Sequence, residues 1–251
     1  MTQGSGRGIC PYSTPQVRLT LDGMNEAIYR PRQPMTIAEL RDVAQAATAG
    51  EPRGEGLSDL ERALIGFGLA AATTALDIDG MRACADEAAA RGATADQLTC
   101  VLLLVTGLGM HTLHEGVREL RPVVEELEPS VYASPLTPEQ EALKQELEGD
   151  SSYWARLETQ LPGFLDGLLR LAPTAYQRFF EFCALAWETD SLDARTKELV
   201  YLAVDASPTH RYGPGFRLHL DNARRMGASP MQIDETLDLA AQAPPHRGVS
   251  W

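Results

Sequence analysis

An internal repeat constrains the fold of this chain more than any other feature of its sequence. Shifting the sequence against itself by 135 residues aligns residues 57–111 with residues 192–246 without a gap, and 14 of these 55 positions are identical. The identities include Gly80/Gly215, Gln97/Gln232 and His111/His246, which amphipathic composition alone does not explain. Self-similarity at a fixed offset is typical of a duplicated supersecondary unit, so we predict two tandem copies of one unit.

Both copies, and the chain around them, have the hydrophobic period of α-helices. Apolar residues recur three and four positions apart, and no segment shows the alternation of a half-buried strand. Ser58 followed by Glu61 predicts a capped helix start, and Gly92 and Gly227 predict helix ends. The predicted helices are 37–47, 59–76, 79–91, 95–106, 115–127, 138–148, 174–187, 193–204, 215–226 and 230–241.

A single helical hairpin of this kind exposes too much apolar surface to be stable alone, whereas two copies can bury each other's apolar faces. The predicted fold is therefore all-α, with two helical units packed as a pseudo-dimer within one chain. Pro and Ser are concentrated in residues 128–140, which suggests a connection between the units. We predict an N-terminal arm (1–35), a first repeat (36–130), and connecting helices with the second repeat (131–251).

Charge and cysteine content limit the environment and the partners. The formal net charge of −13 argues against binding nucleic acid or an anionic membrane, both of which require clustered Lys and Arg. The four cysteines form no C-x-x-C pair, and we expect no signal peptide and no apolar run of about 20 residues that could span a bilayer. These features predict a protein in the reducing cytoplasm.

The second copy carries a recognisable pattern. It reads LDARTKELVYLAV at 192–204 and THRYGPGFRLHLDNARRMGASPMQI at 209–233. This order and spacing resembles the carboxymuconolactone decarboxylase and alkylhydroperoxidase-D superfamily; the matching residues are Arg195, Glu198, Leu199, Arg217, Leu218, His219, Ala223 and Gly227. The resemblance implies a helical enzyme that needs no cofactor. It also implies a homo-oligomer, either a trimer of two-unit chains or a dimer.

Two departures from that pattern restrict the function. The peroxidase branch uses a C-x-x-C pair where this chain has Tyr212 and Gly215, neither of which can cycle a disulfide, so peroxidase activity is disfavoured. The turn before His219 is about two residues longer than in the simple decarboxylases. In the first copy, Ala63 and Cys84 stand where the second has Glu198 and His219, so we expect one functional site per chain with the first copy as scaffold.

His219 and Glu198 are the predicted catalytic residues. An imidazole can hold and return a proton near neutral pH, and the resemblance implies that Glu198 tunes or orients it. Each residue also has a structural alternative. His219 lies on an apolar helix face and could be a buried structural residue, and Glu198 could form an ion pair with Arg195 three positions earlier.

The predicted substrate-binding residues are His210, Arg211, Tyr212, Arg217 and His246. A flexible turn beside Gly213 could bring the first three over a pocket, although such loop residues are often merely exposed. Arg217 could hold a carboxylate through two parallel hydrogen bonds, or could form a structural salt bridge.

No metal site or cofactor motif is predicted. His111 and His246 occupy equivalent positions, and His114 with Glu115 follows the first of them, but H-x-x-H-E is not a metalloprotease signature. No flavin or nicotinamide motif is present in the sequence. The aromatic residues of the central helices are expected to fill the core or an interface; they are Trp154, Phe179, Phe180, Phe182 and Trp187.

The predicted function is cofactor-independent decarboxylation of a small carbonyl or lactone carboxylic acid by His/Glu acid–base chemistry. Two alternatives remain open at this point. One is a natural-product tailoring cyclase or isomerase that uses the same proton transfers, and the other is a catalytically silent oligomeric scaffold that binds a ligand.

Overall fold

Helices make up all the regular secondary structure in residues 33–249, the part of the chain that this computed structural model describes. Their bounds are α1 Ile37–Ala47, α2 Asp59–Ala71, α3 Ile78–Ala90, α4 Ala95–Thr106, the 3₁₀ turn η1 Gly107–Gly109, α5 Met110–Leu127, α6 Ser130–Ala133, α7 Pro138–Leu147, α8 Ser152–Gln160, α9 Phe164–Leu171, α10 Pro173–Leu185, α11 Ala194–Ala206, α12 Gly213–Arg225 and α13 Pro230–Ala241. The all-α prediction is confirmed. The predicted N-terminal arm lies almost entirely outside the described residues.

The duplication predicted from the sequence is present in the helices themselves. The bounds of α2, α3 and α4 become those of α11, α12 and α13 when 135 is added to each residue number. The first helices of the copies are capped alike, because Ser58 and Asp193 each accept a hydrogen bond from a backbone N–H three residues on. The division into residues 36–130 and 131–251 stays a prediction.

The two copies pack against each other through their first helices. Helix α11 contacts α2 and α4 of the first copy, and α13 contacts α2. Leu64, Leu199 and Val200 are each 0–1% exposed in the core that both copies share. Each copy therefore covers the apolar face that the other would expose to water.

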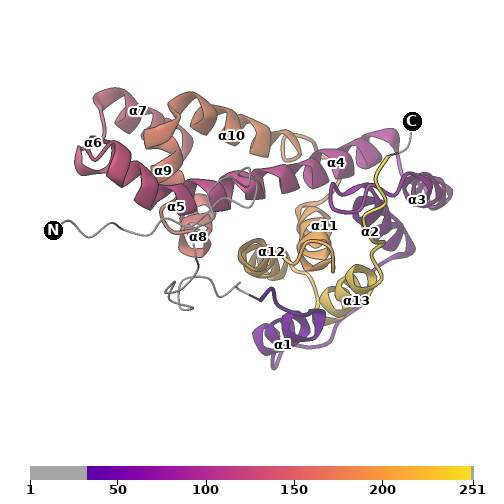
Figure 1. The fold of residues 1–251 in the computed structure, drawn as a ribbon. Coiled ribbons are helices and arrows are strands. Elements are labelled where there is room, and N and C mark those ends of the chain that lie inside the picture. The colour runs from indigo at the N-terminus through magenta and orange to yellow at the C-terminus, as the bar shows by residue number, and fades with distance from the viewer. Residues whose placement is uncertain (1–32, 250–251) are drawn as a thin grey trace, which may run out of the picture. The chain divides into compact units, whose positions relative to one another are not determined.

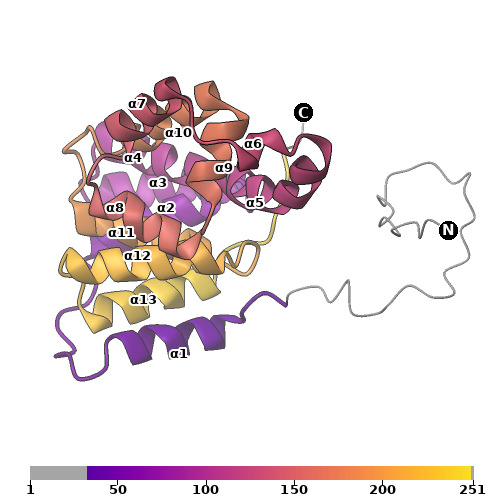
Figure 2. The ribbon, with the colours of Figure 1, turned by 90° about the vertical axis from the view of Figure 1, so that its left-hand side faces the viewer.

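The central helices form a second core. Helix α9 packs against α5, α7 and α10, and its apolar face is buried with aromatic residues of α10. In both Figure 1 and Figure 2, α7 and α10 lie on one side of the α4–α5 run, and α12, α13 and α1 lie on the other. Helices α6, α8 and α9 were not predicted, because they are short and lie where no repeat helps to define them.

One continuous helical stretch, Ala95–Leu127, is formed by α4, η1 and α5. An 18-residue window in it has a mean hydropathy of 1.3, so by length and composition it could cross a membrane, contrary to the expectation that no stretch would. Only 39% of that window is buried in this structure, and the core helices of soluble proteins pass the same test. The observation is therefore weak support for a membrane span.

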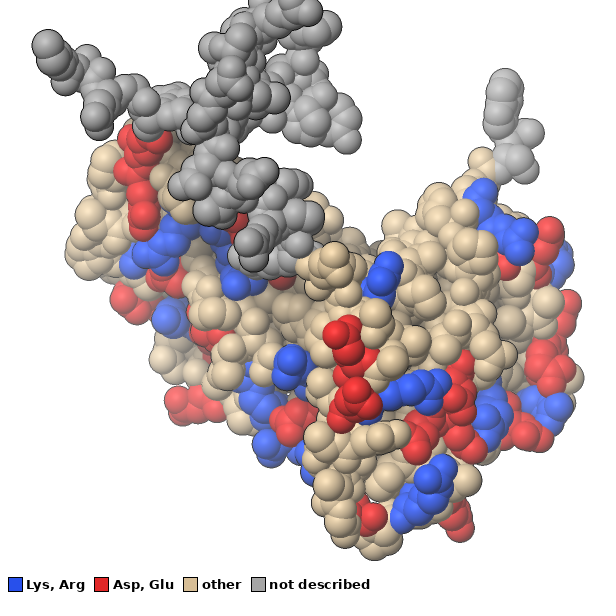
Figure 3. Space-filling view, turned by 60° about the horizontal axis from the view of Figure 1, so that its bottom comes forward, with Lys and Arg blue, Asp and Glu red and all other residues tan. Residues whose placement is uncertain are grey.

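Acidic and basic side chains are interspersed on the surface. On the face drawn in Figure 3, Lys and Arg lie among Asp and Glu without forming a continuous basic area in the described part of the chain. Several arginines are paired, for example Arg62 with Glu235 at 2.6 Å and Arg225 with Asp221 at 2.8 Å. Exposed pairs of this kind contribute little to stability.

Candidate active site

Glu198 and His219 form a buried pair between α11 and α12. Nδ1 of His219 lies 2.7 Å from Oε2 of Glu198, and their side chains are 8% and 1% exposed. Asn222, one turn further along α12, donates from Nδ2 to the other carboxylate oxygen at 3.1 Å. Since both oxygens of Glu198 are engaged, the carboxylate is fixed and Nε2 of His219 is the nitrogen left for other partners.

The surroundings of His219 favour its protonated form. Burial lowers the pKa of an imidazole because the cation loses hydration, but the charge and hydrogen bond of Glu198 outweigh that effect, and the pKa is raised above 6.5. The ring of Tyr201 stacks on the imidazole at 4.5 Å with an interplanar angle of 17°. His219 is thus held in one orientation and is suited to give a proton near neutral pH.

Asp205 is a third buried acidic or basic group at this site, and sequence analysis missed it. It lies two turns after Glu198 on α11, is 1% exposed, and places Oδ2 3.9 Å from Nε2 of His219. Neither of its carboxylate oxygens has a hydrogen-bond partner among the described residues. Burial raises the pKa of Asp205 to about 7, with the charge of His219 opposing the shift.

The turn from α11 to α12 brings His210 back over Asp205. The backbone N–H groups of His210 and Arg211 both donate to the carbonyl of Ser207 at 3.0 Å, and that of Tyr212 donates to the carbonyl of Asp205 at 2.9 Å. Arg211 has φ +51°, the left-handed conformation that reverses the chain. The longer turn noted in the sequence therefore places an additional imidazole at the site.

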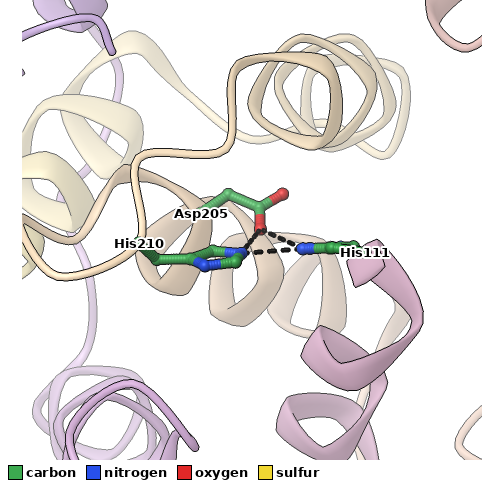
Figure 4. Close-up of side chains that lie close together, drawn as sticks. All are labelled: His111, Asp205 and His210. Atoms are coloured by element: carbon green, nitrogen blue, oxygen red, sulfur yellow. Dashed lines mark hydrogen bonds and ion pairs between the residues drawn. The ribbon is translucent and has the colours of Figure 1, made fainter. Parts of the chain in front are cut away.

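His111, Asp205 and His210 form a compact cluster from three separate segments (Figure 4). Oδ1 of Asp205 lies 3.6 Å from Nε2 of His210 and 3.9 Å from Nδ1 of His111, and the two imidazole nitrogens are 2.7 Å apart. Burial lowers the pKa of His111 to about 2, assisted by the nearby His210, and it lowers that of His210 to about 4. Both imidazoles are therefore neutral at pH 7.

A cavity lies beside these groups, between the central helices and α11–α12. Its polar lining includes His111, His114, Tyr153, Tyr201, Tyr212 and His219, and the rest is mainly apolar. Among the described residues that line it there is no Lys, Arg, Asp or Glu. A ligand in this cavity meets imidazole and phenol groups on an otherwise apolar wall.

Comparisons with known proteins agree with the sequence pattern. The model of the carboxymuconolactone decarboxylase family matches residues 173–244, which contain Glu198, Asp205 and His219. A crystal structure from Burkholderia xenovorans, whose provisional name is gamma-carboxymuconolactone decarboxylase subunit, is 33% identical with a TM-score of 0.63, and the match covers 82% of this chain and 77% of that chain. This chain belongs to the carboxymuconolactone decarboxylase family. A search of curated proteins returned no match. At the family level, these matches support a decarboxylase-like function.

In this member of the carboxymuconolactone decarboxylase family, the buried Glu198–His219 pair occurs in the second copy alone, whereas His111 and His114 of the first repeat also line the cavity. The positions equivalent to Glu198, Tyr201, Asp205, His210 and His219 hold Ala63, Gly66, Ala70, Ala75 and Cys84. None of these five residues of the first copy supplies a carboxylate or an imidazole. This distribution supports the prediction of one site per chain.

Three of the predicted substrate-binding residues lie away from the cavity. Arg217 is on the exposed face of α12, Arg211 is exposed and donates to the carbonyl of Pro208, and His246 is exposed beyond the end of α13. None of the three lines the cavity, so for this cavity their predicted role does not hold. Tyr212 does line it, and His210 lies next to it in the cluster with Asp205.

The structure contradicts the alternative role of Glu198 as the ion-pair partner of Arg195. Glu198 does not pair with Arg195, because Arg195 instead pairs with Glu61 of the first copy at 3.0 Å. The expectation that the central aromatic residues fill the core is confirmed for Phe179 and Phe180, which are buried in the second core, and Trp154, Phe179 and Phe182 also line the cavity. They are expected to shape the apolar part of the binding site.

Gly215, which stands where the peroxidase branch has a cysteine, is required by the position of Asp205. A Cβ at this position would overlap the Asp205 carboxylate, whereas a Cβ at Gly213 meets no atom within 4 Å. We expect Gly215→Ala to lower the free energy of unfolding by about 1–3 kcal/mol, because an added carbon in a packed site forces its neighbours to shift. Urea unfolding of Gly215→Ala and of the control Gly213→Ala checks this. Equal stability of the two variants would contradict it.

Proposed function

We propose that this protein is a decarboxylase-like lyase that acts on a small carbonyl or lactone carboxylic acid through acid–base chemistry by His219 and Glu198. The observation that carries the proposal is the buried Glu198–His219 pair, which fixes an imidazole in the wall of the cavity. A buried acid–base pair that lines a cavity is the usual form of a proton-transfer site.

The proposed step balances without any group outside the substrate and the chain. The bond between the carboxylate carbon and the adjacent carbon breaks, CO₂ leaves, and the electron pair moves into the neighbouring carbonyl as an enolate. Before the transfer, Glu198 stabilises the imidazolium of His219 through the hydrogen bond at Nδ1. Nε2 of His219 then gives its proton to the enolate carbon or oxygen. His219 then regains a proton from water.

The lining of the cavity favours loss of CO₂ in a way that sequence analysis did not anticipate. No Arg or Lys is among the described residues that line it, so a carboxylate bound there would lie against imidazoles and phenols. Arg156 lines a neighbouring hollow, which shares Tyr153 and Tyr201 with this cavity. A carboxylate is costly to place in an apolar environment, and neutral CO₂ is not. Tyr153 and Tyr201 also line the cavity, and their hydroxyls are the candidates to donate to the carbonyl oxygen where negative charge develops, because the Tyr212 hydroxyl already donates to Glu115.

A second candidate is a cyclase or isomerase that uses the same pair for proton transfer. The turn at residues 207–212 favours it, because it adds His210 to the site and can shape the cavity for another substrate. A silent ligand-binding scaffold is the third candidate. The fixed Glu198–His219 pair argues against it, since a buried carboxylate that holds an imidazole in a cavity wall is an arrangement typical of proton-transfer sites.

We also propose that the chain forms a homo-oligomer in the cytoplasm, as the family resemblance suggests. An exposed apolar stripe supports the first part, because Leu120, Val123 and Leu127 on α5 are 52%, 50% and 73% exposed and lie on one helix face. Light scattering of the purified protein is expected to give the mass of a trimer or dimer. A monomeric mass at micromolar concentration would contradict this.

Turnover of defined substrates tests the proposed reaction. Wild type is incubated with gamma-carboxymuconolactone and a panel of β-oxo acids, and product is followed by NMR. Product formation by wild type and its loss in His219→Gln would support the decarboxylase. Rearranged product without release of CO₂ would identify the isomerase, and absence of turnover with tight binding would favour the scaffold.

A further inference from the structure

The Asp205 carboxylate is buried without a hydrogen-bond partner among the described residues, and Nε2 of His219 lies 3.9 Å from its Oδ2. The Asp205 side chain is 1% exposed. A buried carboxylate is costly unless it is paired, hydrogen-bonded or bound to a cation. The groups nearest to it that can act as ligands are imidazole nitrogens, and those of His111 and His210 lie on the side of Oδ1 (Figure 4).

The spacing of these three atoms fits a metal ion. Nδ1 of His111, Nε2 of His210 and Oδ1 of Asp205 are separated by 2.7, 3.6 and 3.9 Å. The triangle they form has a centre about 2.0 Å from every corner, which is the usual length of zinc–nitrogen and zinc–oxygen bonds. An ion at that centre would be coplanar with its ligands, whereas ligand atoms around a tetrahedral zinc ion lie about 3.3 Å apart. The three atoms can therefore bind one ion if the two imidazole nitrogens, now 2.7 Å apart, separate by about 0.6 Å.

We propose that His111, His210 and Asp205 bind one divalent transition-metal ion, such as Zn²⁺, at the edge of the cavity. Two imidazoles and one carboxylate are a donor set that suits such ions, and three protein ligands leave a coordination position for water or substrate. The site differs from the sequence-based prediction that no metal binds. The ligands come from α5, α11 and the turn before α12, so no short motif in the sequence brings them together.

Neighbouring groups hold two of these ligands in place. The ring of His111 stacks on Tyr212 at 3.9 Å and 20°, and the Tyr212 hydroxyl donates to Glu115 at 3.0 Å. The backbone of His210 is fixed by the bond from its N–H to Ser207. Contacts of this kind, made to the metal-binding side chains by residues that do not bind the metal, orient those side chains and raise metal affinity.

A hydrogen bond between the two imidazoles is the competing explanation of the cluster. One neutral imidazole can donate to the other over 2.7 Å, and no ion is then needed. That arrangement leaves the Asp205 oxygens without a hydrogen bond from a described residue. A bound ion would explain why all three side chains lie together, whereas the hydrogen bond explains the position of the two imidazoles alone.

Metal binding by the purified full-length chain tests the proposal. After dialysis against a chelator, Zn²⁺ is titrated by calorimetry, and Co²⁺ is added separately as a spectroscopic probe. We expect one ion per chain and a visible Co²⁺ absorption band from the wild type. His111→Ala, His210→Ala and Asp205→Asn should each weaken Zn²⁺ binding at least about tenfold, since even loss of an outer contact has such an effect.

His246→Ala is the matched control, because His246 is exposed and outside the cluster. It should bind Zn²⁺ like the wild type, and circular dichroism should show that all variants are folded. Absence of Zn²⁺ and Co²⁺ binding by the wild type at millimolar metal would overturn the proposal, as would unchanged affinity in the folded cluster variants. These experiments measure metal binding and not turnover. The metal site can therefore be confirmed even if the proposed decarboxylase reaction is wrong, and the reaction can be confirmed even if no metal binds.

Discussion

His219→Gln is expected to lower kcat by about 10²–10⁴-fold, the range in which general acid–base catalysis contributes. Gln can fill most of the space of the imidazole and can still donate to Glu198, so the buried carboxylate keeps a partner. It cannot hold and release a proton near neutral pH. Because the loss concerns proton transfer and not the shape of the cavity, KM should change much less than kcat.

Steady-state kinetics on the substrate identified from the panel measures this effect. His246→Gln is the control, since it makes the same replacement at an exposed histidine outside the cavity. Thermal unfolding of both variants shows whether the fold is kept. If folded His219→Gln retains kcat within a few-fold of wild type, His219 is not the proton donor and the proposed mechanism is wrong.

The fold was largely predictable because the same three-helix pattern occurs twice in the sequence. The predicted helices 37–47, 95–106 and 230–241 match the observed bounds, and most others differ by one or two residues. The predicted and observed helix ends differ more where the chain turns back and where one helix continues into the next. The second predicted helix ends at Ala71 instead of residue 76, and α5 begins at Met110 instead of residue 115 because it continues from α4 through a 3₁₀ turn.

The Glu198–His219 pair was predicted as catalytic through the resemblance, but Asp205 was missed. Asp205 lies within the apolar segment 199–206, where it can be taken for one polar position on an amphipathic helix. A signal was available, since the equivalent residue of the first copy is Ala70 and an acidic residue at a core position needs a partner. The partners themselves depend on tertiary structure and could not be read from spacing.

Helical geometry explains why the predicted arginines do not reach the cavity. Arg217 precedes His219 by two residues, which rotates it by about 200° around α12. If His219 faces the site, Arg217 must face away from it, and this could have been inferred from the sequence. Arg211 differs, because its outward direction follows from the left-handed backbone of the turn, which no pattern in the chain indicates.

Phe164→Ala is expected to lower the free energy of unfolding by about 3–5 kcal/mol, the usual effect of removing a fully buried aromatic side chain. Phe164 is 0% exposed at the start of α9. Its ring makes T-shaped contacts with the rings of Phe179 and His114, with centroid distances of 5.3 and 4.5 Å. The cavity left behind would border two residues that line the ligand cavity. The variant is therefore expected to lose stability and to loosen one wall of the site.

Urea unfolding followed by circular dichroism measures the first effect, and Val249→Ala is the control because Val249 is 65% exposed and outside the stripe proposed for oligomerisation. The control should change the free energy of unfolding by less than about 0.5 kcal/mol. A loss below about 1 kcal/mol in Phe164→Ala would mean that the central helices do not form a cooperative core with the repeats. The resemblance gave no support for these helices, so their stability depends on the apolar area that α5, α9 and α10 bury together.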